Sequence, residues 1–419
     1  MILTHRLFGI LLLISNQKTA FSQVLPPLPL TDSLKKLPYQ FFYFKKGLVE
    51  QGQGNYSTAI LDYTIFMEDN KKLPPYPKAF YQRANAYKMI KDYKRAIIDF
   101  EKLHTFRNDA DGATGAGQCF AALQNTEKAI SWFRKGLERA PQSAVLQNEL
   151  GMQYCIKSEF SAGVRAFHSA IKNDSSFAIA YNNIGAATYF DQDVDSPERA
   201  DVLQAKAWFD KALYYDKSLS LAWKNRGAVN YFLKDYTAAK SDLQEALRLN
   251  KFDAQAHLYL GITHAALKND AEALTELQEA VRIKPDLEIG YEELGHLAAQ
   301  GKNWVQALAA YDLALRATNP KAKQYQGLIS YYKALIHSTL EDEKQVKTAL
   351  QTARKLGVFA DRAVYTAFIQ QPLLKKYQQK GWLKAIYQQL ERIGKETKFG
   401  NTQLKWFKMR QGATQKVAR

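Results

Sequence analysis

Cysteine is almost absent from this sequence, in which Cys119 and Cys155 are the only two among 419 residues. Small exported domains that lack a large core depend on several disulfides. So few cysteines exclude a disulfide framework as the source of stability. Both cysteines fall in segments with a helical pattern, which favours small buried thiols over a reactive site. Because 46% of the residues are hydrophobic, the chain can build a large core without cross-links.

Long apolar runs are missing as well. The run at residues 7–14 is far shorter than the roughly 20 apolar residues that a membrane-spanning helix needs. His5 and Arg6 precede it, and the small residues of the stretch 20–22 follow it. This pattern predicts a secretory signal at residues 1–22 that is cleaved before folding; the alternative, an uncleaved anchor, is disfavoured by the short run. We therefore expect an exported protein, periplasmic or secreted, with no transmembrane segment after cleavage.

Charge is abundant but unevenly distributed along the chain, whose formal net charge is +17. Residues 371–419 contain twelve Lys or Arg against two Glu, a net of +10. Residues 270–293 contain eight acids against two bases, a net of −6. The basic C-terminal end and the acidic stretch before it therefore differ strongly in the partners that they can attract.

Motifs for catalysis and for ligand binding are also missing. The glycine-rich run at 112–118 has no Lys-Ser or Lys-Thr after it and no strand before it, so it does not fit a phosphate-binding loop. His257 and His264 lie seven residues apart on one helical face, but further metal ligands are not near them in the sequence. There is no Gly-x-Ser-x-Gly or His-Glu-x-x-His motif. We expect no catalytic residue, metal or cofactor, and rank an enzyme third among the functions considered.

What the sequence does have is a regular ladder of small residues. Successive members are 33 to 37 residues apart, with one spacing of 42: Gly47, Ala84, Gly117, Gly151, Gly185, Gly227, Gly261 and Gly295. A second small residue follows each of them, at an offset of twelve in seven of the eight cases: Ala59, Ala96, Ala129, Gly163, Ala205, Ala239, Ala273 and Ala307. Four residues further on stands a large side chain: Tyr63, Phe100, Phe133, Phe167, Phe209, Leu243, Leu277 and Tyr311.

The ladder predicts pairs of antiparallel helices that approach each other closely. A glycine inside a helix costs about 1 kcal/mol relative to alanine, so a glycine such as Gly261 requires a compensating contact. A small residue on each helix of a pair supplies it, and the large side chain fills the neighbouring gap. Short polar turns such as residues 268–270 separate the two helices of a pair.

This pattern resembles the tetratricopeptide repeat (TPR), a helix–turn–helix unit of 34 residues. The stretches AYNNIGAATY at 180–189 and AEALTELQEAVRIKP at 271–285 match its two halves. The resemblance implies an all-α fold, a right-handed superhelical solenoid of stacked helix-turn-helix repeats with C-terminal capping helices. Together with the composition of the two ends, it divides the chain into a signal peptide at 1–22, a Pro-rich linker at 23–39, a solenoid of about nine repeats at 40–356, capping helices at 357–398 and a basic tail at 399–419.

The spacing of 42 reflects an insertion at 190–204 in the fifth repeat. Its Asp191, Asp193 and Asp195 suggest a divalent-ion loop, but Ser196 stands where the EF-hand pattern requires glycine. The stretch Ser-Pro-Glu at 196–198 instead favours a helix cap followed by proline in the first turn. We therefore expect the second helix of this repeat to start early.

The resemblance also implies a concave groove lined by the first helix of each repeat, and hence a protein or peptide partner. The groove residues that it indicates are Gln118, Asn148, Asn182, Asn183, Lys224 and Asn225, with Tyr189 and Tyr231 in the last turns of two first helices. Asparagine can pair with a peptide group through both its donor and its acceptor, so these side chains would hold an extended segment and face solvent without it. The alternative is that asparagine at these positions is structural, since it is common there in the repeat generally.

The basic tail leaves two interpretations open. It contains Trp406 and Phe407 among its positive charges, which suits an anionic envelope surface of lipid, lipopolysaccharide or peptidoglycan. It equally suits a solvated tail, or one resting on the acidic stretch of repeats seven and eight. Nucleic acid is not an expected partner of an exported protein. The sequence as a whole predicts a non-catalytic protein-interaction scaffold of the bacterial envelope, with attachment to the envelope surface through the basic end as the alternative.

Overall fold

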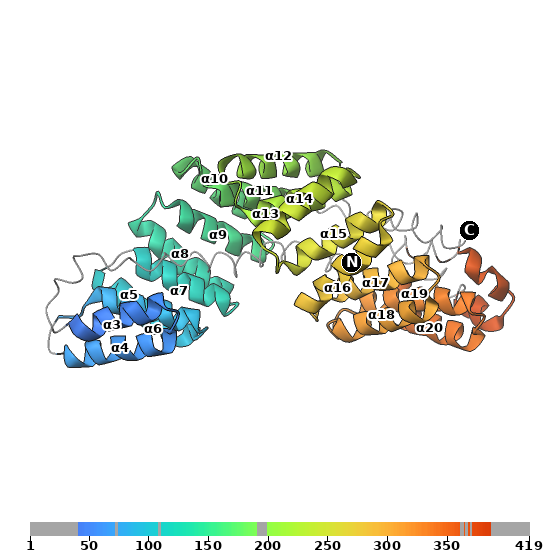
Figure 1. The fold of residues 1–419 in the computed structure, drawn as a ribbon, viewed down its shortest axis with the longest axis horizontal. Helices are drawn as coiled ribbons and strands as arrows, with labels where there is room; N and C mark the ends of the chain where they lie inside the picture. The colour runs from blue at the N-terminus through green and yellow to red at the C-terminus, as the bar shows by residue number, and fades with distance from the viewer. Residues whose placement is uncertain are drawn as a thin grey trace. The chain divides into compact units, whose positions relative to one another are not determined.

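The computed structural model describes residues 41–71, 74–107, 110–190, 199–360, 364, 368 and 371–386. In these residues the chain is a succession of α-helices, α3 to α20, joined by short turns, and the same residues contain no strand (Figure 1). The prediction of an all-α solenoid is confirmed. The helices divide into two compact units, with α3 to α11 in the N-terminal unit and α12 to α20 in the C-terminal unit, except that residues 214–216 group with the former.

The N-terminal unit consists of helix pairs, which we call the first and second helix of each repeat. Its helices are α3 (Phe42–Gly52), α4 (Tyr56–Asp69), α5 (Pro77–Met89), α6 (Tyr93–Arg107), α7 (Ala110–Ala122), α8 (Thr126–Arg139), α9 (Ala144–Ile156), α10 (Phe160–Asn173) and α11 (Ala178–Phe190). Each helix packs on the next, and first helices such as α7 and α9 also touch each other. The core therefore runs through the stack of helices as a continuous layer.

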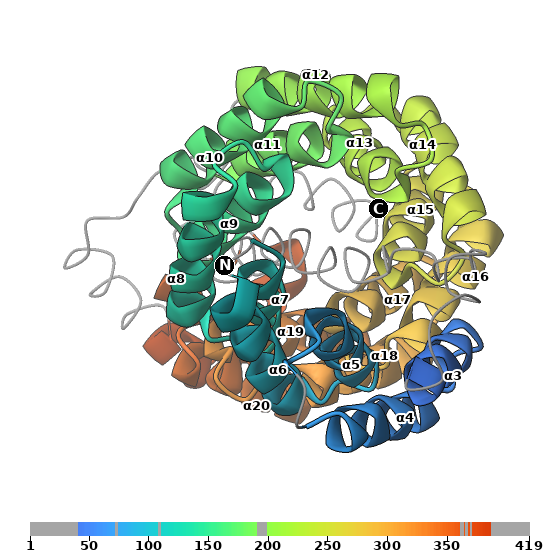
Figure 2. The same cartoon turned by 90° about the vertical axis from the view of Figure 1, so that its left-hand side faces the viewer.

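The C-terminal unit repeats this arrangement. Its helices are α12 (Arg199–Tyr215), α13 (Ser220–Phe232), α14 (Tyr236–Leu249), α15 (Ala254–Ala266), α16 (Asp270–Ile283), α17 (Glu288–Gln300), α18 (Trp304–Ala317), α19 (Lys323–Thr339) and α20 (Glu343–Lys355). In Figure 2 the first helices α13 and α15 lie on one side of this unit and the second helices α14 and α16 on the other. The second helix α12 has 17 residues, more than any other described second helix, as expected for an early start; residues 191–198 before it lie outside the described part.

The glycine ladder is explained by direct contact with the large side chain of the second helix. A Cβ atom added to Gly261 would lie 2.8 Å from Cγ of Leu277, closer than real Cβ atoms come. The same atom on Gly117 would lie 2.5 Å from the ring of Phe133, and on Gly295 2.5 Å from the ring of Tyr311. The large side chain thus lies on the glycine itself rather than in a gap beside it. This contact offsets the helix cost of the glycine.

In the fourth repeat glycine stands on both helices. A Cβ atom on Gly163 would overlap Sγ of Cys155 and lie 2.9 Å from the carbonyl oxygen of Gly151.

Both cysteines of the chain, Cys119 and Cys155, are buried and reduced, which confirms the prediction of small buried thiols. Burial raises the pKa of Cys119 to about 12, while the charge of Lys88 opposes the rise, so this thiol is not a nucleophile at neutral pH.

Wherever the structure describes the turn between the two helices of a repeat, one residue of that turn has the left-handed conformation, at the same position in each. Seven of these residues are not glycine: Lys91, Gln124, Ser158, Lys234, Lys268, Lys302 and Glu341, with φ between 58° and 68°. The first repeat has Gly54 there, with φ of 82°. The next helix then starts at a polar cap in several repeats; the side chain of Asp235, for example, accepts a hydrogen bond from the backbone N–H of Ala238. The predicted polar turns are confirmed.

Buried ion pairs recur between the two helices of a repeat. Arg83 donates two hydrogen bonds of 2.8 Å to the buried carboxylate of Asp99. Arg226 makes the same fork with Asp242, at 2.9 and 2.7 Å, and its third nitrogen donates to Asp210 of α12. Since removing one partner of a buried pair leaves an uncompensated charge, each fork helps to hold the second helix of the repeat against the first.

The segment after α20 packs on the ninth repeat. Its buried side chains, Val358, Phe359, Val364, Phe368, Leu374, Tyr377, Leu383 and Ile386, join one core cluster with α19 and α20. Polar contacts add to this, since the indole N–H of Trp382 donates to Glu343 at 3.1 Å. In the described part of the segment, residues 358–360 and 372–377 form 3₁₀ turns, and residues 364, 368 and 381–386 are α-helical. It covers the last repeat as expected of a cap, and the predicted signal peptide, linker and tail lie outside the described residues.

Replacing Gly261 with leucine should destabilise the protein by more than about 2 kcal/mol, because the new side chain must displace Leu277 and force α15 from α16. The matched control is Gly301→Leu, since a Cβ atom there meets nothing closer than 3.6 Å. Chemical denaturation of both variants measures the difference. Equal losses of stability in the two variants would contradict the packing argument.

Replacing Lys268 with glycine should stabilise the protein. Its side chain is exposed and its φ is 68°. The left-handed conformation costs a residue with a Cβ atom about 1–2 kcal/mol, whereas glycine loses about 0.5–1 kcal/mol through unfolded-state entropy. We expect a net gain of up to about 1 kcal/mol from those two terms. The control Lys268→Ala removes the same side chain but keeps the strained backbone, so a gain in that variant too would show that backbone strain is not the cause.

Candidate partner-binding face

The first-helix face consists of the side chains two and three residues before, and one and four residues after, the small residue of each first helix. In the N-terminal unit it runs over α3, α5, α7, α9 and α11. Figure 2 shows α9 and α11 on one side of this unit and α8 and α10 on the other. Because equivalent positions recur with the repeat, their side chains meet from one first helix to the next.

A polar ladder runs along this face of the N-terminal unit. Gln51 donates to Gln82 at 3.3 Å, which joins α3 to α5. Lys88 donates to Gln118 at 2.9 Å, and Gln118 donates to Glu149 at 3.1 Å, which joins α5, α7 and α9. Asn183 donates to Asn148 at 2.9 Å and accepts from Asn182 at 3.2 Å, which joins α9 to α11. We call these eight side chains the polar ladder; it links five successive first helices.

The middle of the ladder combines two opposite charges of limited exposure. Burial raises the pKa of Glu149, and the hydrogen bond from Gln118 and the charge of Lys88 oppose the rise. Burial lowers the pKa of Lys88, against the influence of Cys119 and Glu149. The amide of Gln118 lies between them and can serve both, because it accepts from the ammonium and donates to the carboxylate.

The expectation that the asparagines face solvent is wrong. The exposed fractions are 5% for Asn148, 1% for Asn182, 0% for Asn183, 0% for Lys224 and 2% for Asn225. In the N-terminal unit the three asparagines bond to one another, which supports the structural alternative for them. A buried polar group must be hydrogen-bonded to be tolerated, so these side chains help to hold adjacent first helices in register.

The other predicted site residues differ in exposure. Gln118 is half-buried within the ladder, and Tyr231 is half-buried at the end of α13. The ring of Tyr231 packs on those of Phe232 and Tyr236, with centroids 5.7 and 5.6 Å apart. Tyr189 belongs to α11, but its side chain lies outside the described residues. A role of these residues in binding stays a prediction.

Sequence reasoning missed the N-terminal half of the ladder. Gln51, Gln82 and Lys88 are half-buried, so they are more accessible than the asparagines. Gln82 occupies the same position before Ala84 as Asn183 occupies before Gly185. That register, counted from Ala84, was the available signal.

The first-helix face of the C-terminal unit carries a different set of side chains. The buried ammonium of Lys224 donates to Gln255 at 3.0 Å and lies 3.2 Å from Asp253, which joins α13 to α15. Glu292 of α17 accepts from the hydroxyl of Tyr325 of α19 at 2.9 Å. Its other oxygen lies 3.3 Å from Nε2 of His296. Charged and aromatic groups therefore take a larger part here than in the N-terminal ladder.

In the part of the chain that the structure describes, no group of three or more His, Cys, Asp or Glu side chains could hold a metal ion. No helix of the described chain is long and apolar enough to cross a membrane. His257 instead bonds to Glu276, and His264 lies 3.3 Å from the amide of Asn269.

The stacked helix pairs and their ladders define the class as an all-α repeat solenoid. The tetratricopeptide repeat family matches residues 230–288 and, through a second model of the same repeat, residues 113–143. Both ranges consist of helix pairs described above. These matches, together with the helix pairs, support a tetratricopeptide repeat protein. No curated protein matches it.

Solved structures with the same type of fold share little sequence with this chain. A tetratricopeptide repeat protein from Parabacteroides merdae ATCC 43184 has 12% identity and a TM-score of 0.49, over 60% of this chain and 95% of the other. YrrB, described as a TPR protein with an unusual peptide-binding site, has 18% identity and a TM-score of 0.34, over 46% and 95% of the two chains. The pilF protein of Pseudomonas aeruginosa has 15% identity and a TM-score of 0.43, over 50% and 92%.

A double-mutant cycle should detect the ladder in the stability of the protein. Asn183→Ala removes a bond of 2.9 Å and leaves Asn148 buried without that donor, so we expect a loss of about 1–3 kcal/mol. Asn148→Ala should cost a similar amount, and the double variant clearly less than the sum. Thermal or chemical unfolding of the four proteins gives the coupling energy. Additive losses would mean that the two amides do not depend on each other.

Proposed function

We propose that this protein is a non-catalytic scaffold that binds a segment of another protein, or a peptide, along the first-helix face of its N-terminal unit. The polar ladder is the observation that carries this proposal. A solenoid that needed only stability would place apolar side chains between its first helices, because a buried polar group costs free energy unless it is bonded. In this protein, amide side chains lie between the successive first helices α3, α5, α7, α9 and α11.

The accessible end of the ladder suits an extended segment. Gln51, Gln82 and Gln118 lie half-buried on three successive first helices. An amide side chain offers a donor and an acceptor, the two groups that a peptide backbone also presents. Gln82 accepts from Gln51 through its carbonyl oxygen, which leaves its NH₂ group to donate to a bound carbonyl. Amides at the repeat spacing can therefore hold a backbone without selecting its side chains strongly.

Export to the cell envelope is part of the proposal. It is supported by the basic residues, apolar run and small residues of the stretch 1–22, which have the order of a secretory signal. The low cysteine content is compatible with this, because the fold is held by packed helices and needs no disulfides. The partner would then be another envelope protein, or a segment of one.

Attachment through the basic C-terminal end is the alternative, and it is favoured by the net charge of +10 in residues 371–419. Salt separates the two functions. Binding that depends mainly on surface charge weakens strongly as salt screens it, whereas hydrogen bonds and apolar contacts on the helix face are less affected. Deleting residues 399–419 removes five of those positive charges and leaves every described residue in place.

Site-specific photo-crosslinking in cells tests the proposed face. A photoreactive residue at Gln82 or at Gln118 should capture a defined partner. The matched control position is Ser131, which is exposed on the second helix α8. We expect adducts at the first two positions and not at the third. Adducts at Ser131 alone, or adducts that vanish only when residues 399–419 are deleted, would contradict the proposal.

The captured partner then allows an affinity measurement. Changing Gln82 and Gln118 together to alanine removes two side chains that bond the segment, each worth about 0.5–1.5 kcal/mol, so binding should weaken by about one to two orders of magnitude. The variant's stability is measured alongside, and Ser131→Ala serves as the control. Unchanged affinity would move the binding site away from this face.

A further inference from the structure

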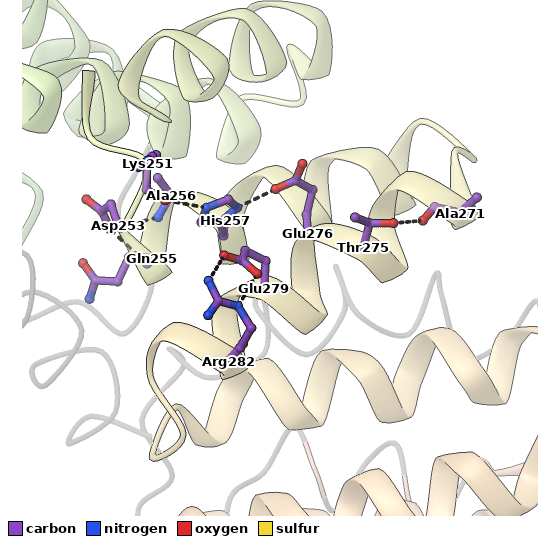
Figure 3. A network of polar contacts seen from close by, with 10 residues as sticks. All are labelled: Lys251, Asp253, Gln255, Ala256, His257, Ala271, Thr275, Glu276, Glu279 and Arg282. Carbon is purple, nitrogen blue, oxygen red and sulfur yellow. Dashed lines mark hydrogen bonds and ion pairs between the residues drawn. The ribbon is translucent and has the colours of Figure 1, made fainter. Parts of the chain in front are cut away.

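His257 occupies an unusual place between two acceptors. Its Nδ1 lies 2.6 Å from a carboxylate oxygen of Glu276 on the second helix α16. Its Nε2 lies 3.1 Å from the backbone carbonyl oxygen of Lys251, in the turn that leads from α14 into α15 (Figure 3). The ring therefore ties the turn between the sixth and seventh repeats to the second helix of the seventh.

Other repeats use the same position for a ring that donates to this turn. Trp223, four residues before Gly227, donates its indole N–H to the carbonyl of Lys217 at 2.8 Å. Tyr181, four residues before Gly185, donates its hydroxyl to the carbonyl of Ser175 at 3.1 Å. In all three repeats the acceptor lies six residues earlier in the chain. By this comparison Nε2 of His257 carries a hydrogen and donates to Lys251.

The second acceptor makes His257 different from the other two rings. A carboxylate oxygen can only accept from the ring, so Nδ1 must carry a hydrogen as well. A neutral imidazole has one N–H and can serve either Glu276 or Lys251, while its bare nitrogen faces the other oxygen. Only the imidazolium satisfies both contacts. Trp223 and Tyr181 hold their turns without titrating near neutral pH.

The charged groups around the ring come from several elements. On α16, Glu276 bonds to the ring directly, and Glu279, which is paired with Arg282 at its other side, adds negative charge. In the turn and at the start of α15, Asp253 lies against Lys224 of α13. Other charged side chains of the neighbouring helices interact with partners of their own. Arg226 pairs with Asp242 and Arg248 pairs with Glu245, while Glu288 lies within the influence of Lys284.

These influences act on the pKa of His257 in opposite directions. Burial lowers it, whereas the hydrogen bond to Glu276, the carbonyl of Lys251 and the charges of Glu276 and Glu279 raise it, and the net direction is upward. The pKa of His257 in the folded state thus lies above the ordinary value of about 6.5, which the ring has in the unfolded chain. The charged ring therefore makes its full contribution to stability at a pH below about 6.5. This contribution is lost as the pH rises through the folded-state pKa.

We propose that His257 is a proton-dependent staple, which holds the turn before α15 against α16 when it is charged and releases one of its two contacts when it is neutral. The junction between the sixth and seventh repeats is thus tighter in acid than in base. The device is independent of the proposed partner-binding face, which lies in the N-terminal unit. It needs no ligand and acts through bonds within the C-terminal unit alone.

Histidine titration and hydrogen exchange of the full chain test this staple. The ring signal of His257, identified by its loss in His257→Tyr, should titrate with a midpoint above about 6.5. Protection of the backbone amides of residues 251–256, corrected for intrinsic exchange, should fall about two- to tenfold between acid and mildly basic pH, the factor that one net hydrogen bond corresponds to. A midpoint at or below the ordinary value overturns the proposal.

Two variants distinguish the staple from general effects of pH. His257→Tyr should keep the contact to Lys251, as Tyr181 does in its own repeat, and abolish the pH dependence of the turn. If that variant does not fold, Glu276→Gln keeps the ring and should lower the midpoint of His257. The control is His337→Tyr on α19, whose pKa is lowered by burial; it should leave the turn unchanged. A pH dependence that survives in His257→Tyr, or an unmoved midpoint in Glu276→Gln, refutes the staple.

Discussion

The contact between a glycine of the first helix and a large side chain of the second is the constraint on which the rest of this structure depends. At Gly117, Gly151 and Gly295 a single added carbon would lie about 2.5–2.6 Å from an aromatic ring, so the two helices are as close as a backbone without side chain permits. In these repeats the first helix is therefore placed by its own second helix. The faces that the repeats present to one another follow from that placement.

Because the helix pairs are so closely set, the remaining positions of the first helix can carry polar groups. The ladder from Gln51 to Asn183 joins neighbouring repeats through side-chain bonds, in addition to the apolar core that they share. Such bonds are directional and fix the register of one repeat on the next more narrowly than methyl groups do. A partner that binds at the half-buried glutamines would meet groups that are already oriented by their neighbours, which reduces the entropy lost on binding.

The same position of the repeat can have different physical roles, depending on the side chain that occupies it. The ring four residues before the small residue holds the preceding turn whether it is Tyr181, Trp223 or His257. Only the histidine adds a second acceptor and a dependence on protonation. In the same way the left-handed turn position accepts Gly54 or a lysine, because the surrounding helices impose its conformation at the expense of local strain.

The sequence alone determined the helix pairs, their turns and the glycine contacts, because small and large residues recur with a fixed period and local periodicity decides which side of a helix is buried. It also indicated the positions of the first-helix face, including Asn183 and Lys224. Only the tertiary structure decided that those side chains are buried and bonded across repeats, and that Gln82 and Lys88 belong with them. The physical reason is that exposure and hydrogen bonding depend on side chains about 31 to 35 residues away, whose distances and rotamers no local pattern encodes.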